Sequence, residues 1–429
     1  MKVKVRTASL VAGISLMLAG SASADSLAGS ASAEAVEGTT TSAAILGSDG
    51  METGGMEVSG AQTEAAEEAG GSLFDYNSGV MKTLSNDGEG YSLAGIEGIN
   101  VGGWLSFGYT SRSTGMFNDQ PDQINLHQTW LYAEKVADGS EGLDWGFRFD
   151  AMYGTDAGDT QAFGNNPGKW DYENGFDRGG GYGFALPQAY LELAYEDFSV
   201  IGGHFYTLLG YEVVPSPDNF FFSHAFTMYN SEAFTHTGVL GSYSGIEGLD
   251  IYAGWTAGWD TGFDQYDGGS SFLGGFSYTP IDQVSVTYIA TAGNLGAIGK
   301  GYTHSIVVDT MPIDDIGLNY VFQSDYVDVT DFSTIGINQY LMYFPWDEIG
   351  FGIRGEWWNI FAKDTGGENT SYYQTTIGTH LKPLPNVIIR PELRWQWSSD
   401  AGKNPAYGVA GLPVYGDGVI FGMDVVLTF

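Results

Sequence analysis

Hydrophobic and polar residues alternate along most of the chain that follows Gly98. Between Leu249 and Trp259 every odd-numbered residue is apolar, while the even-numbered residues are Asp, Tyr, Gly or Thr. This two-residue period is typical of a β-strand that has one face on an apolar medium and the other on water. The segments run for about ten residues, which is the length of a tilted strand that crosses a bilayer.

The alternating segments predict about sixteen strands. They lie near residues 99–110, 124–135, 143–153, 185–195, 198–209, 235–244, 249–259, 270–279, 284–292, 302–310, 315–324, 334–343, 349–359, 372–381, 387–397 and 418–429. An even number of antiparallel strands puts both ends of the chain on the same side of a closed barrel. A barrel of this size encloses an aqueous channel rather than a packed core.

The connections between the predicted strands alternate in length. One set is short and often carries Pro with Asp, Asn or Gln, as turns do: 136–142, 196–197, 245–248, 280–283, 311–314, 344–348 and 382–386. The other set is longer and rich in Gly and Asp: 111–123, 154–184, 210–234, 260–269, 293–301, 325–333, 360–371 and 398–416. We therefore predict an all-β fold, a transmembrane antiparallel β-barrel with short periplasmic turns, long extracellular loops and both termini in the periplasm.

A soluble β-sandwich would also alternate, but two further features favour the barrel. Aromatic residues cluster near predicted strand ends, as in Tyr153, Tyr195, Trp259 and Trp397, where a membrane girdle would lie. The opposite face of the strands carries many glycines and charged residues, as expected of a wet lumen. Closure also removes the free strand edges that lipid does not tolerate.

Residues 1–98 differ from the rest of the chain. Residues 1–24 have a basic start, a short apolar stretch and Ala-Ser-Ala at 22–24, which predicts a cleaved secretory signal peptide. Residues 25–98 are rich in Ala, Ser, Gly, Thr and Glu, with Lys82 as their only basic residue. This composition predicts an acidic, low-complexity, disordered leader, followed by a barrel domain over 99–429. Whether this leader acts as a spacer, a lumen insert or an envelope anchor stays open.

The overall composition narrows the function classes. The formal net charge is −36 and there is no cysteine. Nucleic-acid binding requires the opposite sign of charge. The lack of cysteine excludes disulfides, c-type haem attachment and cysteine zinc sites. Stability must therefore come from burial and from backbone pairing.

Four stretches of the barrel region carry a resemblance to a known family. They are 202–226 (GGHFYTLLGYEVVPSPDNFFFSHAF), 233–244 (AFTHTGVLGSYS), 350–358 (GFGIRGEWW) and 388–397 (IIRPELRWQW). The region resembles bacterial outer-membrane porins, and among them the putative β-barrel porin-2 (OmpL-like) family. The resemblance implies passive diffusion of small hydrophilic solutes and ions through a water-filled barrel in the outer membrane of a Gram-negative envelope, with no cofactor. It also makes outer-membrane lipid, lipopolysaccharide and the barrel-assembly machinery the expected partners, and a homotrimer an expected assembly.

The connection 210–234 is the candidate constriction. In general porins the loop after the fifth strand folds into the lumen and narrows it, and the resemblance gives this connection the same place. It is unusually apolar for a water-exposed loop. Packing over the pore mouth or at a subunit interface is the alternative. The candidate constriction residues are Tyr211, Glu212, Asp218, Phe220, Phe221, Phe222 and His224.

Charged residues on the predicted inner face are the candidate pore lining. A charge that faces lipid at mid-membrane costs about 2–4 kcal/mol, so these side chains are expected to point inward. Such charges either set ion selectivity or brace the wall as pairs, for example Arg354 with Glu356 or Arg390 with Glu392. Acidic loops favour cations, whereas the basic lumen residues favour anions. The candidates are Arg148, Asp150, Glu192, His204, Arg354, Glu356, Arg390, Glu392 and Arg394.

Rival functions have weaker support in the sequence. A plugged barrel that serves as a structural anchor or adhesin would share the fold and differ only in not conducting. An outer-membrane hydrolase would need a converging Ser/His pair, but Tyr243 occupies the centre of the only G-x-S-x-G-like stretch, and no metal or nucleotide motif occurs. No catalytic, metal or cofactor residue is therefore predicted. Phe429 ends the last strand and resembles the terminal aromatic signal for barrel assembly.

Overall fold

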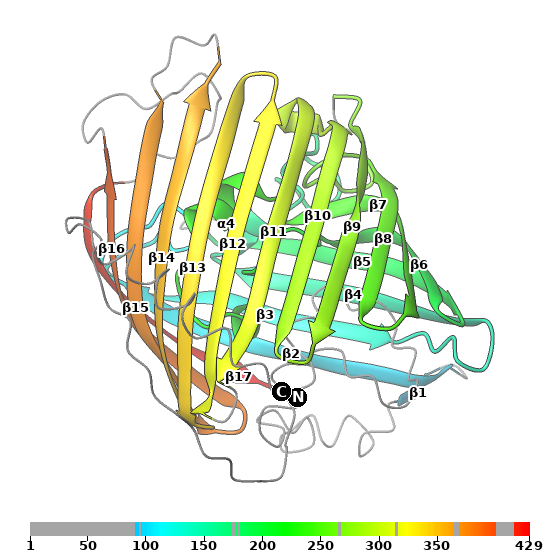
Figure 1. Cartoon of the computed structure of the whole chain (residues 1–429), viewed down its shortest axis with the longest axis horizontal. Coiled ribbons are helices and arrows are strands. Elements are labelled where there is room, and N and C mark those ends of the chain that lie inside the picture. Colours follow the sequence, from blue (N-terminus) through cyan, green and yellow to red (C-terminus); the bar gives the residue numbers. More distant parts are fainter. Residues whose placement is uncertain are drawn as a thin grey trace, which may run out of the picture.

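One antiparallel β-sheet closes on itself to form a barrel (Figure 1). The computed structural model describes residues 91–93, 96–173, 175, 177, 181–264, 267–313, 316–363, 369–399 and 416–429. The strands are β1 (Tyr91–Leu93), β2 (Ile96–Thr110), β3 (Ile124–Lys135), β4 (Asp144–Gly154), β5 (Gly183–Tyr195), β6 (Phe198–Tyr206), β7 (Thr235–Ile246), β8 (Leu249–Thr256), β9 (Ser270–Ile281), β10 (Val284–Asn294), β11 (Lys300–Ile313), β12 (Leu318–Val329), β13 (Phe332–Trp346), β14 (Ile349–Ala362), β15 (Thr370–Leu384), β16 (Val387–Ser398) and β17 (Gly418–Thr428).

The sixteen strands β2–β17 form the closed wall, and each pairs with its neighbour in sequence. The barrel closes between its first and last strands, where Leu427 of β17 lies opposite Leu105 of β2. Backbone hydrogen bonds between Phe429 and Gly103 in both directions continue this closure to the last residue. β1 forms only a short hairpin with the start of β2, so regular structure begins before residue 99. The predicted closed barrel of about sixteen antiparallel strands is confirmed.

All sixteen predicted strands occur, and β3 has the predicted bounds. The main differences lie in the connections. β12 and β13 extend so far that only Thr330 and Asp331 remain of the long loop predicted over 325–333. β8 ends at Thr256, because Gly258 takes a positive φ of 109° and turns the chain. Trp259 therefore leaves the wall. Its side chain is buried inside and donates to Thr291, so its predicted place in an aromatic girdle is wrong.

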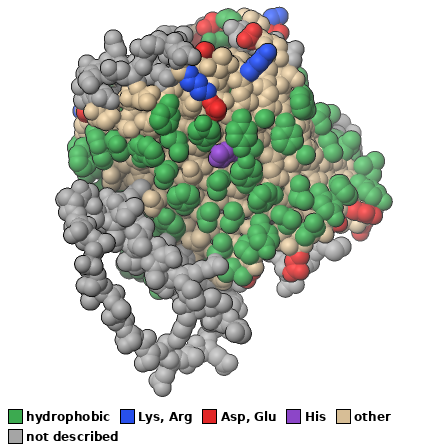
Figure 2. Space-filling model, turned by 45° about the horizontal axis from the view of Figure 1, so that its top comes forward, with side chains coloured by type: hydrophobic (Ala, Val, Ile, Leu, Met, Phe, Trp, Pro, Cys, Tyr) green, Lys and Arg blue, Asp and Glu red, His purple; other side chains and the backbone are tan. Residues whose placement is uncertain are grey.

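The outer face of the barrel is apolar. Figure 2 shows hydrophobic side chains in a broad belt, with charged side chains gathered toward its edges. Along β14 and β16 the exposed apolar residues alternate with buried charged ones, as a lipid-facing wall with a polar interior requires. Large apolar side chains of this belt with more than half of their surface exposed include Leu191, Leu193, Val239, Trp255, Ile377 and Trp395.

The core lies inside the barrel, where the connection between β6 and β7 folds inward. This connection, residues 207–234, contains the 3₁₀ turn η3 (Ser216–Asp218) and the short helix α4 (Phe226–Ser231). Its residues Leu209 and Phe226 pack in one apolar cluster with wall residues from β6, β7, β9, β10 and β12–β15. Val214 and Met228 join a second cluster with β2–β5, β16 and β17. The described residues contain no helix long and apolar enough to cross a membrane.

Candidate functional site

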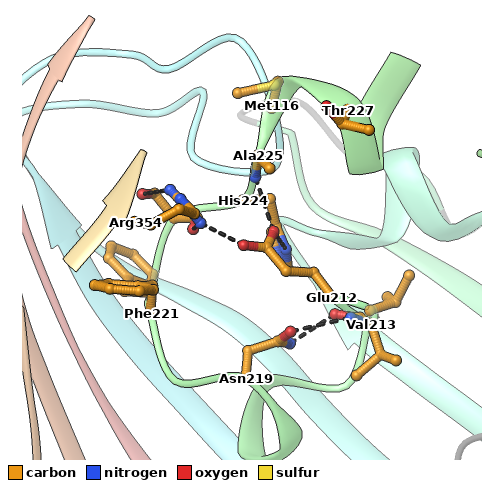
Figure 3. Close-up of polar contacts among 12 residues, drawn as sticks. Met116, Glu212, Val213, Asn219, Phe221, His224, Ala225, Thr227 and Arg354 are labelled. Carbon is orange, nitrogen blue, oxygen red and sulfur yellow. Dashed lines mark hydrogen bonds and ion pairs between the residues drawn. The ribbon is translucent and has the colours of Figure 1, made fainter. Parts of the chain in front are cut away.

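The inward connection, which we call the lumen loop (residues 207–234), has a local fold that its sequence explains. Pro215 precedes the 3₁₀ turn and Pro217 lies within it, and both prolines fix the backbone there. The Asn219 side chain then bridges the turn. Its Nδ2 donates to the carbonyls of Val213 and Pro215, and its Oδ1 accepts from the Val213 amide. Figure 3 shows the hydrogen bonds between Asn219 and Val213. The turn is thus held by contacts within the loop itself.

Three arginines of the wall hold carbonyl groups of the lumen loop. Nη1 of Arg390 on β16 donates to the carbonyls of Ser216 and Asn219, at 2.6 and 2.7 Å. Arg354 on β14 donates to the carbonyl of Ser223 at 2.6 Å, and Arg394 on β16 donates to that of His224 at 2.5 Å. The three arginines are at most 2 % exposed. Each of the three arginines is therefore buried and hydrogen-bonded to the backbone of the lumen loop.

Carboxylates of the wall hold the amides of the same stretch. Glu392 on β16 accepts hydrogen bonds from the amides of Phe222 and Ser223, at 3.0 and 3.2 Å. Glu356 on β14 accepts from the amides of Phe226 and Thr227, the first two residues of α4, at 2.8 and 2.6 Å. A carboxylate at this helix end satisfies amides that have no partner within the helix. Arginines and glutamates thus bind the loop backbone between residues 216 and 227 from the inside of the barrel.

Glu212 of the lumen loop adds to these contacts between the wall and the loop, which together we call the clamp. It forms an ion pair with Arg354 at 2.5 Å and also accepts from the Tyr340 hydroxyl and the Ala225 amide. Figure 3 shows its carboxylate between Arg354 and His224. Burial alone would raise the pKa of Glu212, but Arg354 and the hydrogen bonds outweigh it and lower the pKa to about 2. Glu212 is therefore ionised at neutral pH.

The phenylalanines of the lumen loop fill space that wall glycines leave open. Phe220 lies against Gly350 and Gly352 of β14, where a Cβ on Gly352 would lie 2.4 Å from the ring. Its ring also meets Phe344 and His380 edge-on. Phe222 lies over Gly108 of β2 and Gly422 of β17, the two strands between which the barrel closes. The absence of a side chain at these positions lets the loop approach the wall closely.

The predicted bracing pairs differ from the contacts that form. Arg354 pairs with Glu212 of the loop, and Arg390 forms a two-pronged pair with Asp424 of β17 at 2.9 and 2.5 Å. Glu356 and Glu392 hold loop amides instead. Asp424 was not among the candidates. Its alternating position in the last strand places it inward, but only the register shows that it lies opposite Arg390.

Three other predicted lining residues lie on the wall strands that precede the loop. Arg148 on β4 pairs with Glu134 at 2.5 Å and with Asp150 at 2.7 Å, and it is partly exposed. Asp150 also accepts from the Trp130 indole. Glu192 on β5 is buried on the same side of the wall, opposite Gly146 of β4. Of the loop candidates, Tyr211, Asp218 and Phe220 are partly exposed, whereas Glu212, Phe221, Phe222 and His224 are buried.

The structure places His204 apart from the other lining candidates. It shares a face of β6 with the exposed Val200, whereas Ile201 and Phe205 point into the internal cluster. Its Nδ1 lies 2.8 Å from the Thr237 hydroxyl, and the Trp170 ring packs edge-on against it. His204 therefore lies on the outer side of the wall, covered by a loop, and not on the inner face where it was predicted.

The end of the lumen loop carries a buried carboxyl pair. Nε2 of Gln323 on β12 donates to Glu232 of the loop at 2.6 Å and to Asp325 of β12 at 3.0 Å. Ser305 of β11 donates to Asp325 and accepts from the Gly210 amide, so the start of the loop is tied to the same place. Burial first, and then the proximity of Asp325, raise the pKa of Glu232 well above its usual value.

Cofactor and metal sites were not predicted. Among the described residues there is no group of three or more His, Asp or Glu side chains arranged to hold a metal ion. The interior can bind or exclude small molecules through the clamped loop, its apolar contacts and the charged wall residues around it.

Comparisons with known proteins agree with this architecture. A family model described as putative beta-barrel porin-2, OmpL-like, matches residues 98–429. A search of curated proteins found no match.

Among solved structures, the chain is similar to the outer membrane channel DcaP of Acinetobacter baumannii, with 10% identity, 80% of this chain and 100% of that chain covered, and a TM-score of 0.56. It is similar to the trimer form of the outer membrane protein OmpT of Vibrio cholerae, at 13% identity, 77% and 99% coverage and a TM-score of 0.51. An anion-selective porin from Comamonas acidovorans gives 12% identity, 77% and 100% coverage and a TM-score of 0.50. At these identities the likeness concerns the fold alone.

Proposed function

Because this chain belongs to the putative β-barrel porin-2, OmpL-like family of outer-membrane porins, we propose that it lets small hydrophilic solutes and ions diffuse passively across the outer membrane. The route is the interior of the sixteen-stranded barrel, and the lumen loop is its constriction. Solutes are selected by size where the loop narrows the interior and by charge where the wall is ionised. No cofactor or energy source takes part.

The observation that carries this proposal is the clamp on the lumen loop. Wall arginines and glutamates from β14 and β16 bind the loop backbone from the inside. A loop fixed in this way keeps a constant cross-section against solute and water flow, which a size-selective channel requires. The clamp also explains why arginines and glutamates of β14 and β16 lie inside the barrel, since each of them has a partner in the loop or the wall.

The fold supports a membrane orientation as part of the proposal. The chain end and the short turns lie at one end of the barrel in Figure 1, and longer connections lie at the other. We assign the short-turn end, with both termini, to the periplasm. The apolar belt contacts outer-membrane lipid, and the loops at the far end meet lipopolysaccharide. Residues 1–24 act as a cleaved signal peptide and 25–98 as an acidic leader; the predictions for 1–90 lie outside the described residues.

Two assembly steps complete the proposal. Phe429 is the signal that the barrel-assembly machinery recognises. The backbone hydrogen bonds between Phe429 and Gly103 then close the barrel in the membrane. The native assembly is a homotrimer, as in the OmpT form of similar fold, which is named a trimer. Cross-linking of the protein in native membranes would test the trimer, with a monomer-only pattern as the contrary result.

Solute flux into liposomes tests the central function. Proteoliposomes that contain the full chain are placed in isotonic solutions of uncharged sugars of graded size, and swelling is followed by light scattering. The proposal predicts that small sugars enter quickly and that flux falls steeply with size. Folded barrels that admit no sugar and no ion would instead support a plugged barrel that acts as an anchor or adhesin.

A further inference from the structure

The inner wall of β8–β11 carries a polar strip that the lumen loop does not hold. In cross-strand order, Asp250 lies opposite Ser277, Ser277 opposite Thr287, and Ser285 opposite Asp309. The Ser277 and Thr287 hydroxyls lie 3.1 Å apart. We call these five residues the β8–β11 strip. All five side chains are partly exposed to solvent.

The alternation of the strands places the strip on the inner face. On β9 and β10 the strip residues Ser277 and Thr287 share their face with Leu273 and Ile289, which belong to the internal cluster. The residues of the opposite parity, such as Ile251 and Phe276, are exposed members of the outer belt. The strip therefore contacts the water inside the barrel and not the lipid.

The two carboxylates of the strip have no cationic partner. Among the described residues, neither Asp250 nor Asp309 takes part in an ion pair, and the Asp309 carboxylate accepts a neutral hydrogen bond from Asn319. Both keep part of their surface in water. The negative charge of this wall is thus uncompensated at contact distance.

The basic residues of the interior are arranged in the opposite way. Arg354, Arg390 and Arg394 are buried beneath the lumen loop and occupied by its carbonyls. Arg148 is paired with two carboxylates. Lys382 of β15 interacts with Asp347. A permeating ion therefore meets the strip carboxylates directly, whereas the positive charges are buried or neutralised.

We propose that the β8–β11 strip makes this channel prefer small monovalent cations over anions, with Asp250 and Asp309 as the residues that set the preference. This inference rests on the proposed channel function. A single charge about 5 Å from an ion in water changes the local ion concentration about fourfold, in opposite directions for cation and anion. Low-dielectric walls strengthen the field, salt weakens it, and the three hydroxyls offer oxygen ligands that replace lost hydration water.

The test measures the reversal potential of the full-length protein in a planar bilayer under an about tenfold KCl gradient. The variants are Asp250→Asn, Asp309→Asn and the double variant, which keep size and remove charge. The control removes the same charge at a position outside the strip. Asp122→Asn makes the same charge change on the exposed connection between β2 and β3.

The wild-type channel is expected to pass K⁺ in preference to Cl⁻. Each single Asn variant should lower the permeability ratio by about sixteenfold at most, the product of the two fourfold changes, and by less where salt screens the charge. The double variant should lower the ratio further, and the Asp122→Asn control should keep the wild-type ratio. An anion-preferring wild type, or a double variant with an unchanged ratio, would overturn the assignment and leave the channel function intact. A folded wild type that never conducts would overturn the channel function and this inference with it.

Discussion

Replacing Glu392 by Gln tests whether wall charges hold the lumen loop. The Glu392 carboxylate accepts from the Phe222 amide at 3.0 Å and from the Ser223 amide at 3.2 Å. A glutamine of the same shape keeps one acceptor oxygen and turns an NH₂ group toward the other amide. One charge-assisted hydrogen bond is lost, and a buried donor stays without a partner. Hydrogen bonds to charged groups contribute about 1.5–3 kcal/mol.

The loss should appear as faster local opening of the loop. A cost of about 2–3 kcal/mol corresponds to a roughly 30- to 150-fold increase in the open population. Hydrogen–deuterium exchange with mass spectrometry on the detergent-purified protein measures this population through the Phe222 and Ser223 amides. These amides should exchange faster by that factor in Glu392→Gln, while peptides from β9–β12 keep their wild-type protection.

Glu247→Gln in the exposed β7–β8 turn is the matched control, because it makes the same chemical change away from the loop. It should leave the exchange of the lumen loop unchanged. If the Phe222 and Ser223 amides exchange at the wild-type rate in Glu392→Gln, the carboxylate does not hold the loop. The wall charges would then not be what fixes the lumen loop.

Three further perturbations address other contacts of the lumen loop. Gly352→Ala places a Cβ 2.4 Å from the Phe220 ring, so it should destabilise the barrel by about 1–3 kcal/mol in urea unfolding. Adding Phe220→Ala to the same chain should restore part of this loss. If the stability losses of the two single variants simply add in the double variant, the contact is refuted. Arg390→Ala leaves Asp424 buried without its partner and should cost about 3–5 kcal/mol in the same assay, whereas a loss below about 1 kcal/mol would contradict the pair. The raised pKa of Glu232 means that its contribution to stability is complete below the usual carboxyl pKa and is lost as pH rises through the raised value. As pH rises, exchange of the Gly210 amide should therefore accelerate by more than the intrinsic pH dependence of amide exchange. Glu232→Gln should remove this excess acceleration. An excess that persists in the variant would count against the carboxyl pair.

The strands could be predicted because their signal is local and repetitive. A lipid-facing belt forces an apolar side chain at every second position, so the bounds of β3 and the inward orientation of Arg354 follow from the sequence alone. Positions where the alternation is interrupted were less predictable. The positive φ of Gly258 takes Trp259 out of its strand. The alternation along β6 does place His204 on the face of the exposed Val200, so the inward prediction for His204 followed its polarity and not the pattern.

The partners of the inner charges could not be predicted from alternation. The pattern places Arg354 and Glu356 on one face of β14, and their spacing of two residues led us to expect a pair. The lumen loop offers each of them a different partner, a carboxylate for Arg354 and two amides for Glu356. These contacts join residues that are more than a hundred positions apart, so only the closed barrel reveals them.

Single-channel conductance of the detergent-purified, folded protein in a planar bilayer tests the central claim most directly. A water-filled barrel with a fixed constriction predicts discrete openings of one main amplitude and a linear current–voltage relation. Persistent silence from a barrel that is shown to be folded by its heat-dependent mobility on a gel would contradict passive diffusion, and it would show that the lumen loop closes the channel instead of narrowing it.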